Sequence, residues 1–516
     1  EESSAIGGSG SATPANSSEA ILTSRPPNFT RSSNFNAPVT RTKVPPVSAE
    51  IESVSVKPYP VSTPEIPAAS FKLNEFESRI AEGHRTCHPD SWLIAQGWLE
   101  SDWGGDPMPT MSWLAATGDR PTVCWKRDHH AILVNSAVID LLDDTVESPP
   151  GGEIVRDHTG TPTGLMLEAA AWHLINPMIP NPPLDIRQQS TIHATHYLAK
   201  LGIVAVGSME YASEILDVLD PIRNELAVRV MATMLDRELP IQEPLERLAA
   251  LHNDDQLALI GCKAFLDGTF GSRTAAMLEP FTDDPTNAGT LVELAQRGEV
   301  HEWIERVIEA GLSPSMHAIG DHAARIALDA GDHADGYARS SGYRKQPIRI
   351  EHCQTVHPED IERFAGRIAS MQPIHARDDG RIAVARLGHA RLDHFFPTHA
   401  LSSKAATLAF GSDWPIADPN PIKGIQAAMD GADADGVVTN PNTRIDLTTA
   451  LNAYTSGART ALGMPEVSLR PGDPADIVIT DQPLHSADWA KSPPRIHMTV
   501  CGGKVTYDSS QKDNTP

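Results

Sequence analysis

The sequence predicts an α/β fold centred on a (β/α)8 barrel of the TIM type. From Phe71 almost to residue 460, short apolar runs alternate with amphipathic stretches, the pattern of parallel strands connected by helices. Seven apolar runs read as buried strands, and an eight-stranded barrel is the usual arrangement of so many βα units over about 250 residues. The first barrel strand is therefore expected to be absent or diverged. The seven runs are IVAVGSME (203–210), VRVMATM (228–234), LIGCKAFLDG (259–268), LSPSMHAIGD (312–321), IRIEHCQ (348–354), IASMQPIH (368–375) and ATLAFGSDW (406–414).

The other segments are arranged around this barrel. Residues 1–70 are rich in Ser, Pro, Thr, Asn and Gly and predict a disordered or replaced N-terminal tail, with at most a short strand at 51–56. The barrel domain is expected over 71–464, and Gly and Pro turns between short β-like runs predict an inserted β-rich subdomain at about 104–200. Strand-like runs in 465–510 predict a small C-terminal β-domain.

The composition excludes several classes of function. Lys and Arg total 42 against 67 Asp and Glu, a net charge of −25, so a nucleic acid backbone would be repelled. The five cysteines are widely spaced and form no Cys-x-x-Cys pair, which indicates reduced thiols rather than a disulfide framework. No run of about 18 apolar residues and no signal-peptide pattern occur. No membrane partner is therefore expected. The expected location is cytoplasmic.

Residues that can bind a divalent metal stand at the ends of four predicted strands: Lys263, His317, His352 and Asp413. Each has a structural alternative, since a lone His at a strand end more often packs through a hydrogen bond and Asp413 could cap the next helix. The carboxyl ends of barrel strands meet at one face, however, so four candidates there favour a metal site. Asp413 could both bind metal and transfer a proton.

Lys263 lies in the apolar run CKAFL (262–266). A buried ammonium costs several kcal/mol unless it is paired, neutralised or modified. A neutral lysine amine can react with carbon dioxide to give a carbamate, which is an anionic oxygen ligand. If Lys263 is unmodified, it needs an acidic partner such as Asp413 or Asp267.

Further motifs follow one another over most of the chain: GWLESDW (97–103), DHHAILVNSA (128–137), RDHTGTPTGLMLE (156–168), KAFLDGTFGSRTA (263–275), HAIGDHA (317–323), RIEHCQ (349–354), SMQPIH (370–375), FGSDWP (410–415) and RPGDPADIVI (470–479). In this order they resemble the amidohydrolase superfamily, and specifically the amidohydrolase family 3 branch of metal-dependent hydrolases. The resemblance implies a (β/α)8 barrel beside a small β-sandwich, of which 465–510 would be the C-terminal part. It also implies one or two divalent metals, usually zinc, that activate water to attack a non-peptide carbon-nitrogen bond of a small molecule.

The resemblance also implies roles for single residues. Lys263 would be the carboxylated ligand that bridges two metals, His317 and His352 would be further ligands, and Asp413 would be both a ligand and the general acid/base. Weaker candidates for substrate contact or site architecture are His130, Arg273 and Asp267. Related barrels often form dimers, so a homodimer is a further expectation.

One part of the superfamily pattern is missing. The first strand normally ends in a His-x-His pair that supplies two metal ligands, and no His-x-His occurs in this chain. Three hypotheses follow: the upstream coding segment is shifted or truncated, the chain keeps one metal on the four remaining residues, or it is a catalytically inactive relative that acts at most as a binding protein. If the chain is active, a deaminase or cyclic-amide hydrolase would use the same residues.

Overall fold

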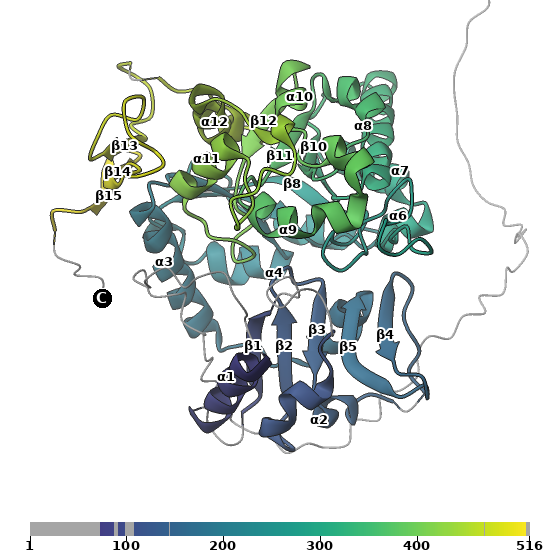
Figure 1. Ribbon diagram of the computed structural model, residues 1–516. Helices are drawn as coiled ribbons and strands as arrows, with labels where there is room; N and C mark the ends of the chain where they lie inside the picture. Colours follow the sequence, from purple (N-terminus) through teal and green to yellow (C-terminus); the bar gives the residue numbers. More distant parts are fainter. Residues whose placement is uncertain (1–72, 87–90, 99–107, 144, 469, 512–516) are drawn as a thin grey trace, which may run out of the picture. The chain divides into compact units, whose positions relative to one another are not determined.

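The computed structural model describes residues 73–86, 91–98, 108–143, 145–468 and 470–511 (Figure 1). All of them belong to one unit that starts at Ala49. The predicted N-terminal tail at 1–70 and its short strand at 51–56 lie outside the described residues. Both stay predictions.

The central element is a curved sheet of parallel strands whose spatial order follows the chain. Its members are β6 (Ala205–Glu210), β7 (Arg229–Met234), β8 (Leu257–Phe265), β9 (Ser313–Ala318), β10 (Arg349–His352), β11 (Ile368–Met371) and β12 (Thr407–Phe410). Each coincides with one of the seven predicted runs, so the prediction of a parallel sheet curved like a TIM barrel is confirmed.

Most helices connect or follow these strands and cover the sheet, whereas α1 (Leu73–Thr86) and α2 (Ser136–Ile139) pack against strands that precede β6 in the chain. The helices around the barrel sheet are α3 (Leu184–Lys200), α4 (Ala212–Glu214), α5 (Gln242–Leu248), α6 (Glu293–Arg297), α7 (Val300–Glu309), α8 (Asp321–Ser341), α9 (His375–Leu387), α10 (Thr398–Ser403), α11 (Pro421–Asp430), α12 (Leu447–Asn452) and α13 (Ala458–Ala461). In α7 the buried residues recur at helical spacing: Val300, Trp303, Ile304, Val307 and Ile308. This stripe faces the sheet because it is the apolar side of the helix.

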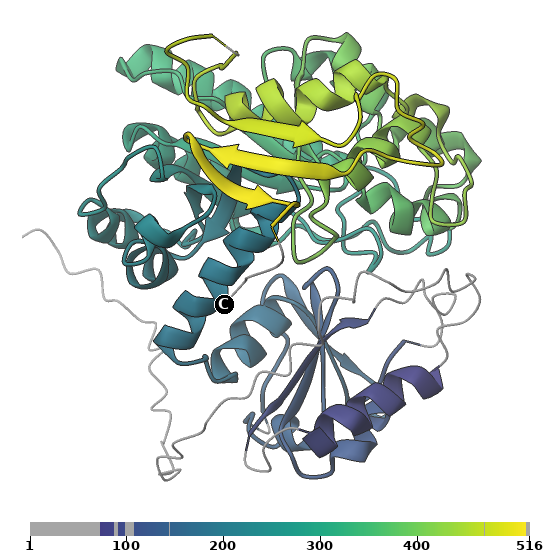
Figure 2. The same ribbon diagram turned by 90° about the vertical axis from the view of Figure 1, so that its left-hand side faces the viewer.

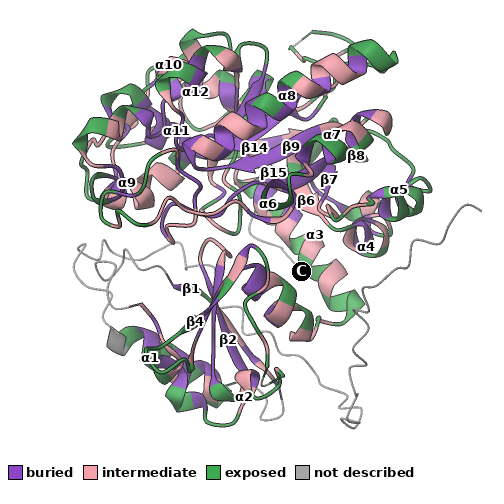
Figure 3. Cartoon of the chain, turned by 90° about the vertical axis from the view of Figure 1, so that its right-hand side faces the viewer, coloured by how far each residue is buried: buried purple, intermediate pink, exposed green. Residues whose placement is uncertain are grey.

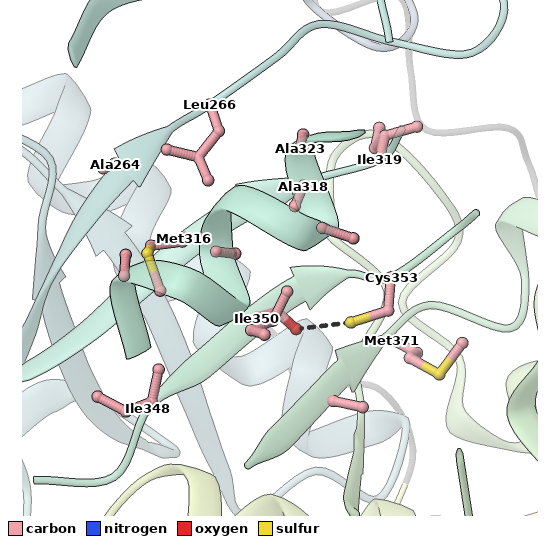
Figure 4. Packing of buried hydrophobic residues seen from close by; sticks show 14 of the residues in the cluster. Ala264, Leu266, Met316, Ala318, Ile319, Ala323, Ile348, Ile350, Cys353 and Met371 are labelled. Atoms are coloured by element: carbon pink, nitrogen blue, oxygen red, sulfur yellow. Dashed lines mark hydrogen bonds between the residues drawn. The ribbon is translucent and has the colours of Figure 1, made fainter. Parts of the chain in front are cut away.

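The outer face of the sheet forms the main core. Ala264, Met316 and Ile350 lie on adjacent strands in paired register and are fully buried. They pack with Ala323 of α8 in the same cluster (Figure 4). Strands covered on both faces have few polar positions, and the sheet is accordingly mostly buried while the helices expose their outward sides (Figure 3).

In the described part of the chain, β6 and β12 are the two edge strands of this sheet. Within the described ranges no strand pairs with either outer edge. Helix α13 packs near the β12 edge, because its Ala461 clusters with Ile368 of β11 and Ala409 of β12 on the inner face of the sheet. The next residue, Leu462, lies close to Gly207 of β6. A β-carbon on residue 207 would be only 2.7 Å from the Leu462 side chain. Whether the first barrel strand is absent or diverged stays a prediction, because the residues before Leu73 lie outside the described ranges.

A second sheet has the order β1-β2-β3-β5-β4. Its strands are β1 (Leu93–Trp98), β2 (Thr122–Lys126), β3 (Ala131–Val134), β4 (Gly152–Arg156) and β5 (Pro162–Glu168). Four of these fall within the range predicted for a β-rich insertion, whereas β1 precedes it. The boundaries 104–200, and those of the other predicted domains, stay predictions.

A third sheet is formed by the C-terminal strands β13 (Ile477–Thr480), β14 (Ile496–Cys501) and β15 (Lys504–Asp508), which are antiparallel and lie beside α3 (Figure 2). The Thr499 hydroxyl donates to the carbonyl of Ala199 at 2.7 Å. A buried ion pair attaches this region to the barrel, since Arg229 of β7 contacts both carboxylate oxygens of Asp476, at 2.7 and 2.8 Å. Arg459 contacts the same carboxylate at 3.1 Å.

We expect Asp476→Asn to lower the free energy of unfolding by about 3 kcal/mol or more, because it leaves two arginines without their buried counter-charge. Urea unfolding followed by circular dichroism measures this. Glu466→Gln is the matched control, since Glu466 is exposed and its replacement should change stability by less than about 0.5 kcal/mol. Equal stability of the two variants would contradict the structural role assigned to Asp476.

Candidate functional site

A cavity of about 1170 Å³ lies at the carboxyl ends of the barrel strands. Lys263 of β8, His317 of β9 and His352 of β10 line it, and Asp413 lines it from the turn after β12. The strand register explains the first two positions. His317 pairs with Phe265, which is two residues from Lys263, and residues two apart on a strand point to the same face. The four predicted ligand residues therefore share one cavity.

The ring of His317 is buried, with 1% of the residue exposed. Its Nε2 lies 3.1 Å from the carbonyl oxygen of Gly268, and an oxygen acceptor requires the proton on Nε2. Nδ1 is then unprotonated, buried, and without a hydrogen-bond partner. Burial, with smaller contributions from neighbouring histidines, holds the pKa of His317 well below its usual value. The residue thus has a neutral imidazole with one free lone pair, which is the form that binds metals.

His352 is also a buried, neutral imidazole with one nitrogen in a hydrogen bond, but it is the opposite tautomer. Its Nδ1 lies 2.9 Å from Oε1 of Gln372, so Nδ1 donates and Nε2 carries the lone pair. Burial lowers the pKa of His352 to about 3. The rings of His317 and His352 are 4.4 Å apart between centroids. A hydrogen-bonded second nitrogen is the usual device for orienting a histidine toward a metal.

Lys263 is 5% exposed, and burial lowers the pKa of its ammonium. Glu351 opposes this effect most strongly, and Asp413 follows. The Glu351 carboxylate accepts from Ser315 at 2.6 Å and from Arg349 at 2.9 Å. The acidic neighbours of Lys263 are thus Glu351 and Asp413. Asp267, the other acidic residue considered for this role, accepts backbone hydrogen bonds from Ala276, Ile319 and Gly320.

Asp413 differs from the other three candidates because it is exposed. Its φ of 57° places it in the left-handed region, which Asp tolerates better than most residues. Its charge favours the protonated forms of Lys263, His352 and His129. Among the residues that the structure describes, no three His, Cys, Asp or Glu side chains converge to hold a metal ion. Among the four predicted ligand residues in the described part of the chain, Lys263 is the one that this search of His, Cys, Asp and Glu side chains does not cover.

His130 enters the same cavity from the turn between β2 and β3. Its Nδ1 lies 2.7 Å from Glu168, and Thr274 donates to the other oxygen of Glu168 at 2.6 Å. Burial opposes the charge on His130, but the Glu168 carboxylate and Asp128 outweigh burial and raise its pKa to about 8. The His130 and His317 rings are 5.2 Å apart between centroids. The structure thus places this predicted contact residue beside the histidine pair.

The two other predicted contact residues lie differently. Asp267 is fully buried and accepts backbone hydrogen bonds from Ala276, Ile319 and Gly320, at 2.9, 3.0 and 2.7 Å. Burial raises its pKa to about 7, and these bonds connect the loops that follow β8 and β9. Arg273 pairs with Asp283 at 2.9 Å and is not among the residues that line the cavity.

Several residues of the site were not singled out from the sequence. Glu351 sits directly before His352 in RIEHCQ, Gln372 lies within SMQPIH, and Glu168 ends RDHTGTPTGLMLE. The signal was present, since all three belong to motifs that carried the resemblance. Their roles depend on partners distant in the chain, which a linear pattern does not reveal.

Comparison with known proteins gives consistent matches. The model of the amidohydrolase family matches residues 55–507. Protein LONG AFTER FAR-RED 3 of Arabidopsis thaliana is 30% identical over 463 residues, covering 84% of this chain and 77% of that protein. The amidohydrolase-like protein YtcJ of Bacillus subtilis (strain 168) is 27% identical, with coverages of 83% and 82%. An uncharacterized metal-dependent hydrolase from Pyrococcus horikoshii superposes with a TM-score of 0.63 at 25% identity, covering 82% of each chain.

No helix in the described part of the chain is long and apolar enough to cross a membrane. The predicted homodimer and the cytoplasmic location stay predictions.

The ion pair beside His130 gives a pH-dependent test. Asp128 accepts from Lys126 at 2.6 Å and from the backbone N–H of His130 at 3.0 Å. Burial would raise the pKa of Asp128, but Lys126 and His130 outweigh it and lower the pKa to about 2. A carboxyl with a depressed pKa stabilises the fold above its unfolded pKa of about 4, and this contribution is lost as pH falls toward 2.

We therefore expect Asp128→Asn to reduce the free energy of unfolding by about 2 kcal/mol at pH 7. The difference from the wild type should shrink as pH falls below 4, because the wild-type carboxylate is then protonated too. Denaturant titrations at pH 7, 5, 4 and 3 provide the measurement. Asp255→Asn, at an exposed position, is the control, and a loss at Asp128 that does not vary with pH would exclude the electrostatic cause.

Proposed function

Since the chain belongs to the amidohydrolase family of metal-dependent hydrolases, we propose that it hydrolyses a non-peptide carbon-nitrogen bond of a small molecule by means of activated water. The cavity at the strand ends is the site of this reaction. The observation that supports it best is the pair of neutral histidines, His317 and His352, each with one nitrogen fixed by a hydrogen bond and the other free.

These residues fit a divalent metal, and zinc suits the donor set. Two imidazole nitrogens and one anionic oxygen make the three protein ligands of a typical catalytic zinc site, with the fourth position left for water or substrate. The orphaned Nδ1 of His317 supports this assignment, because a buried acceptor without a partner is costly. A metal held there would supply Lewis acidity that makes hydroxide accessible at neutral pH.

Lys263 would supply the third ligand as a carbamate. Burial lowers the pKa of its amine and so increases the neutral fraction. The amine lone pair attacks the carbon of carbon dioxide, a nitrogen-carbon bond forms while one carbon-oxygen π bond breaks and its electron pair moves to oxygen, and one amine proton passes to water. Glu351 favours the ammonium over the carbamate, although Arg349 neutralises much of its charge. Occupation of the site by a cation would favour the carbamate.

Asp413 and His130 would handle protons and substrate. Asp413 lines the cavity at the edge of solvent and is free to take a proton from the attacking water and deliver it to the leaving nitrogen. His130, held by Glu168, presents its other ring nitrogen toward the same space and can contact the substrate. Asp267 acts through the loops that it connects and through its 3.5 Å approach to Nε2 of His317.

The alternative is a catalytically inactive barrel that acts as a binding protein. Two observations motivate it: the sequence contains no His-x-His pair, and the described His, Cys, Asp and Glu side chains form no three-ligand set. The two functions differ in metal content and in turnover.

The test is elemental analysis of the full chain purified without chelator. We expect about one zinc, manganese or iron ion per chain, with at least a tenfold loss in His317→Asn and Lys263→Gln, because each removes a proposed ligand. His485→Asn, at an exposed position, should keep the metal. Protein that contains none of these metals would overturn the proposal.

Asp413→Asn separates catalysis from binding. It should hydrolyse N-alkylformamides at a rate on the order of a hundredfold or more below wild type, since a general acid/base contributes about that much. Its metal content should stay near that of the wild type. Equal turnover by Asp413→Asn and wild type would exclude the proton-transfer role.

A further inference from the structure

We infer that Asp379 binds a positively charged nitrogen group of the substrate, so that the amides hydrolysed here carry a protonated amine on a short linker. The inference rests on the proposed function and names its substrate class. Asp379 belongs to α9, is half-buried, and lines the cavity together with His375 of the same helix and Gln354.

Helix α9 brings Asp379 near the histidine pair. His375 and Asp379 are four residues apart, so they lie on the same face of the helix and about 6 Å apart along its axis. The ring of His375 lies 6.3 Å from the ring of His352 between centroids. The carboxyl of Asp379 is therefore one helical turn from a side chain that borders the proposed reaction centre. A short aliphatic linker can span such a separation.

The turn between β2 and β3 borders the same carboxyl. Arg127 in this turn contacts Asp378 of α9 at 3.0 Å, which holds the turn against the helix. Lys126, at the end of β2, acts electrostatically on Asp379. Asp379 thus lies where α9 meets the turn that carries His130, the residue proposed to contact the substrate.

The partner of Asp379 is an uncharged amide. Gln354, which is 1% exposed, donates from its Nε2 to Oδ2 of Asp379 at 2.5 Å. In the described part of the chain, no Lys, Arg or His side chain forms an ion pair with Asp379. Lys126 is paired instead with Asp128, at 2.6 Å. The charge of the Asp379 carboxylate is therefore not neutralised by a contacting side chain.

Most other carboxyl groups of the cavity have a cationic partner. Asp267 is held by backbone N–H groups, and Asp413 is the proposed acid/base. Among the described residues that line the cavity, Glu210 of β6 is the other carboxyl without an ion pair, and it accepts from Ser208. The ion pairs are Asp128 with Lys126, Glu168 with His130, Glu293 with Arg237, Glu351 with Arg349, Asp378 with Arg127 and Asp476 with Arg459.

The charge of the cavity favours a cation over an anion. Its described lining contains twice as many Asp and Glu side chains as Lys and Arg side chains. Every arginine among them is in one of the ion pairs above, so none is left for an anionic substrate. An excess of one sign of charge in a cavity attracts ligands of the opposite sign.

A bound ammonium would offset the cost of ionising Asp379. Burial raises the pKa of this carboxyl to about 7, and Asp378 adds to the effect, although Gln354 and Lys126 oppose it. An opposite charge in contact favours the ionised form, and hydrogen bonds between charged groups are stronger than those between neutral groups. An amine should therefore bind more tightly at this position than a hydroxyl or a methyl group.

The first experiment compares 6-aminohexanamide with hexanamide, 6-hydroxyhexanamide and adipic acid monoamide as substrates of the full chain. At pH 8 the Asp379 carboxyl is mostly ionised and a primary amine is protonated. We expect kcat/KM to be at least tenfold higher for the amino compound than for hexanamide. The hydroxy compound should resemble hexanamide, and the monoamide, which carries a carboxylate, should be the poorest substrate. N-(4-aminobutyl)acetamide and N-butylacetamide give the same comparison with the amine on the nitrogen side, and the inference requires the preference in at least one series.

Variants assign the preference to Asp379. Asp379→Asn should reduce the ratio between the amino and the unsubstituted compound to about one, whereas Asp379→Glu should keep a preference for the amine. Asp379→Lys should favour the monoamide over 6-aminohexanamide. Glu210→Gln and Asp119→Asn, the latter at an exposed position, are the controls and should keep the wild-type ratio.

A purely structural role of Asp379 would lower the rates for both compounds equally and leave their ratio unchanged in Asp379→Asn. That result would overturn the inference. Loss of the preference in Glu210→Gln instead would place the cation at β6 and overturn it as well.

Binding without turnover separates this inference from the proposed function. The probes are 6-amino-1-hexanol and 1-hexanol, which contain no amide, titrated calorimetrically into the wild-type full chain at pH 8. The amino alcohol should bind at least tenfold more tightly, and Asp379→Asn should abolish the difference. If this holds while the wild type hydrolyses no amide of either series, the proposed function fails and the cation site stands. If amides are hydrolysed without preference for the amine and the two alcohols bind equally, the proposed function stands and the cation site is excluded.

Discussion

The parallel register of β8, β9 and β10 is the constraint on which the site depends. Residues opposite one another in this register face the same side, so Lys263, His317 and Glu351 all point into the barrel. Their chain neighbours Ala264, Met316 and Ile350 point outward and anchor the helices. A slip of one residue in any of these strands would exchange the two sets. The residues of the proposed site and those of the core are therefore fixed by the same hydrogen bonds.

Charge inside the barrel is balanced locally. Arg349 and Glu351 lie 2.9 Å apart, and Lys263 sits within reach of their combined field. Burial lowers the pKa of the Lys263 amine, and the nearby carboxylates oppose this effect. An amine on which both influences act therefore lies next to two neutral histidines. The sheet β1–β5 contributes the second set of charges, because Glu168 and Asp128 raise the pKa of His130. The hydrophobic clusters of this sheet contain no barrel strand residue, so polar contacts such as Lys126 with Ser272 at 2.6 Å join the two.

Among the residues that the structure describes, β6 and β12 are the edge strands of the barrel sheet. Near the β12 edge, Ala461 of α13 clusters with Ile368 and Ala409. The pair of Arg229 on β7 and Asp476 before β13 attaches the C-terminal sheet to the barrel.

The sequence by itself determined the seven parallel strands and the four candidate ligand residues, because hydrophobic alternation and strand-end position are local properties of the chain. It also exposed the missing His-x-His pair. Only the tertiary structure decided that Glu351 is the first acidic neighbour of Lys263, that Asp413 is exposed while His317 is buried, and that Arg273 is paired with Asp283. The physical reason is that pairing and burial depend on residues far apart in the chain, which the fold brings together and a linear pattern does not encode.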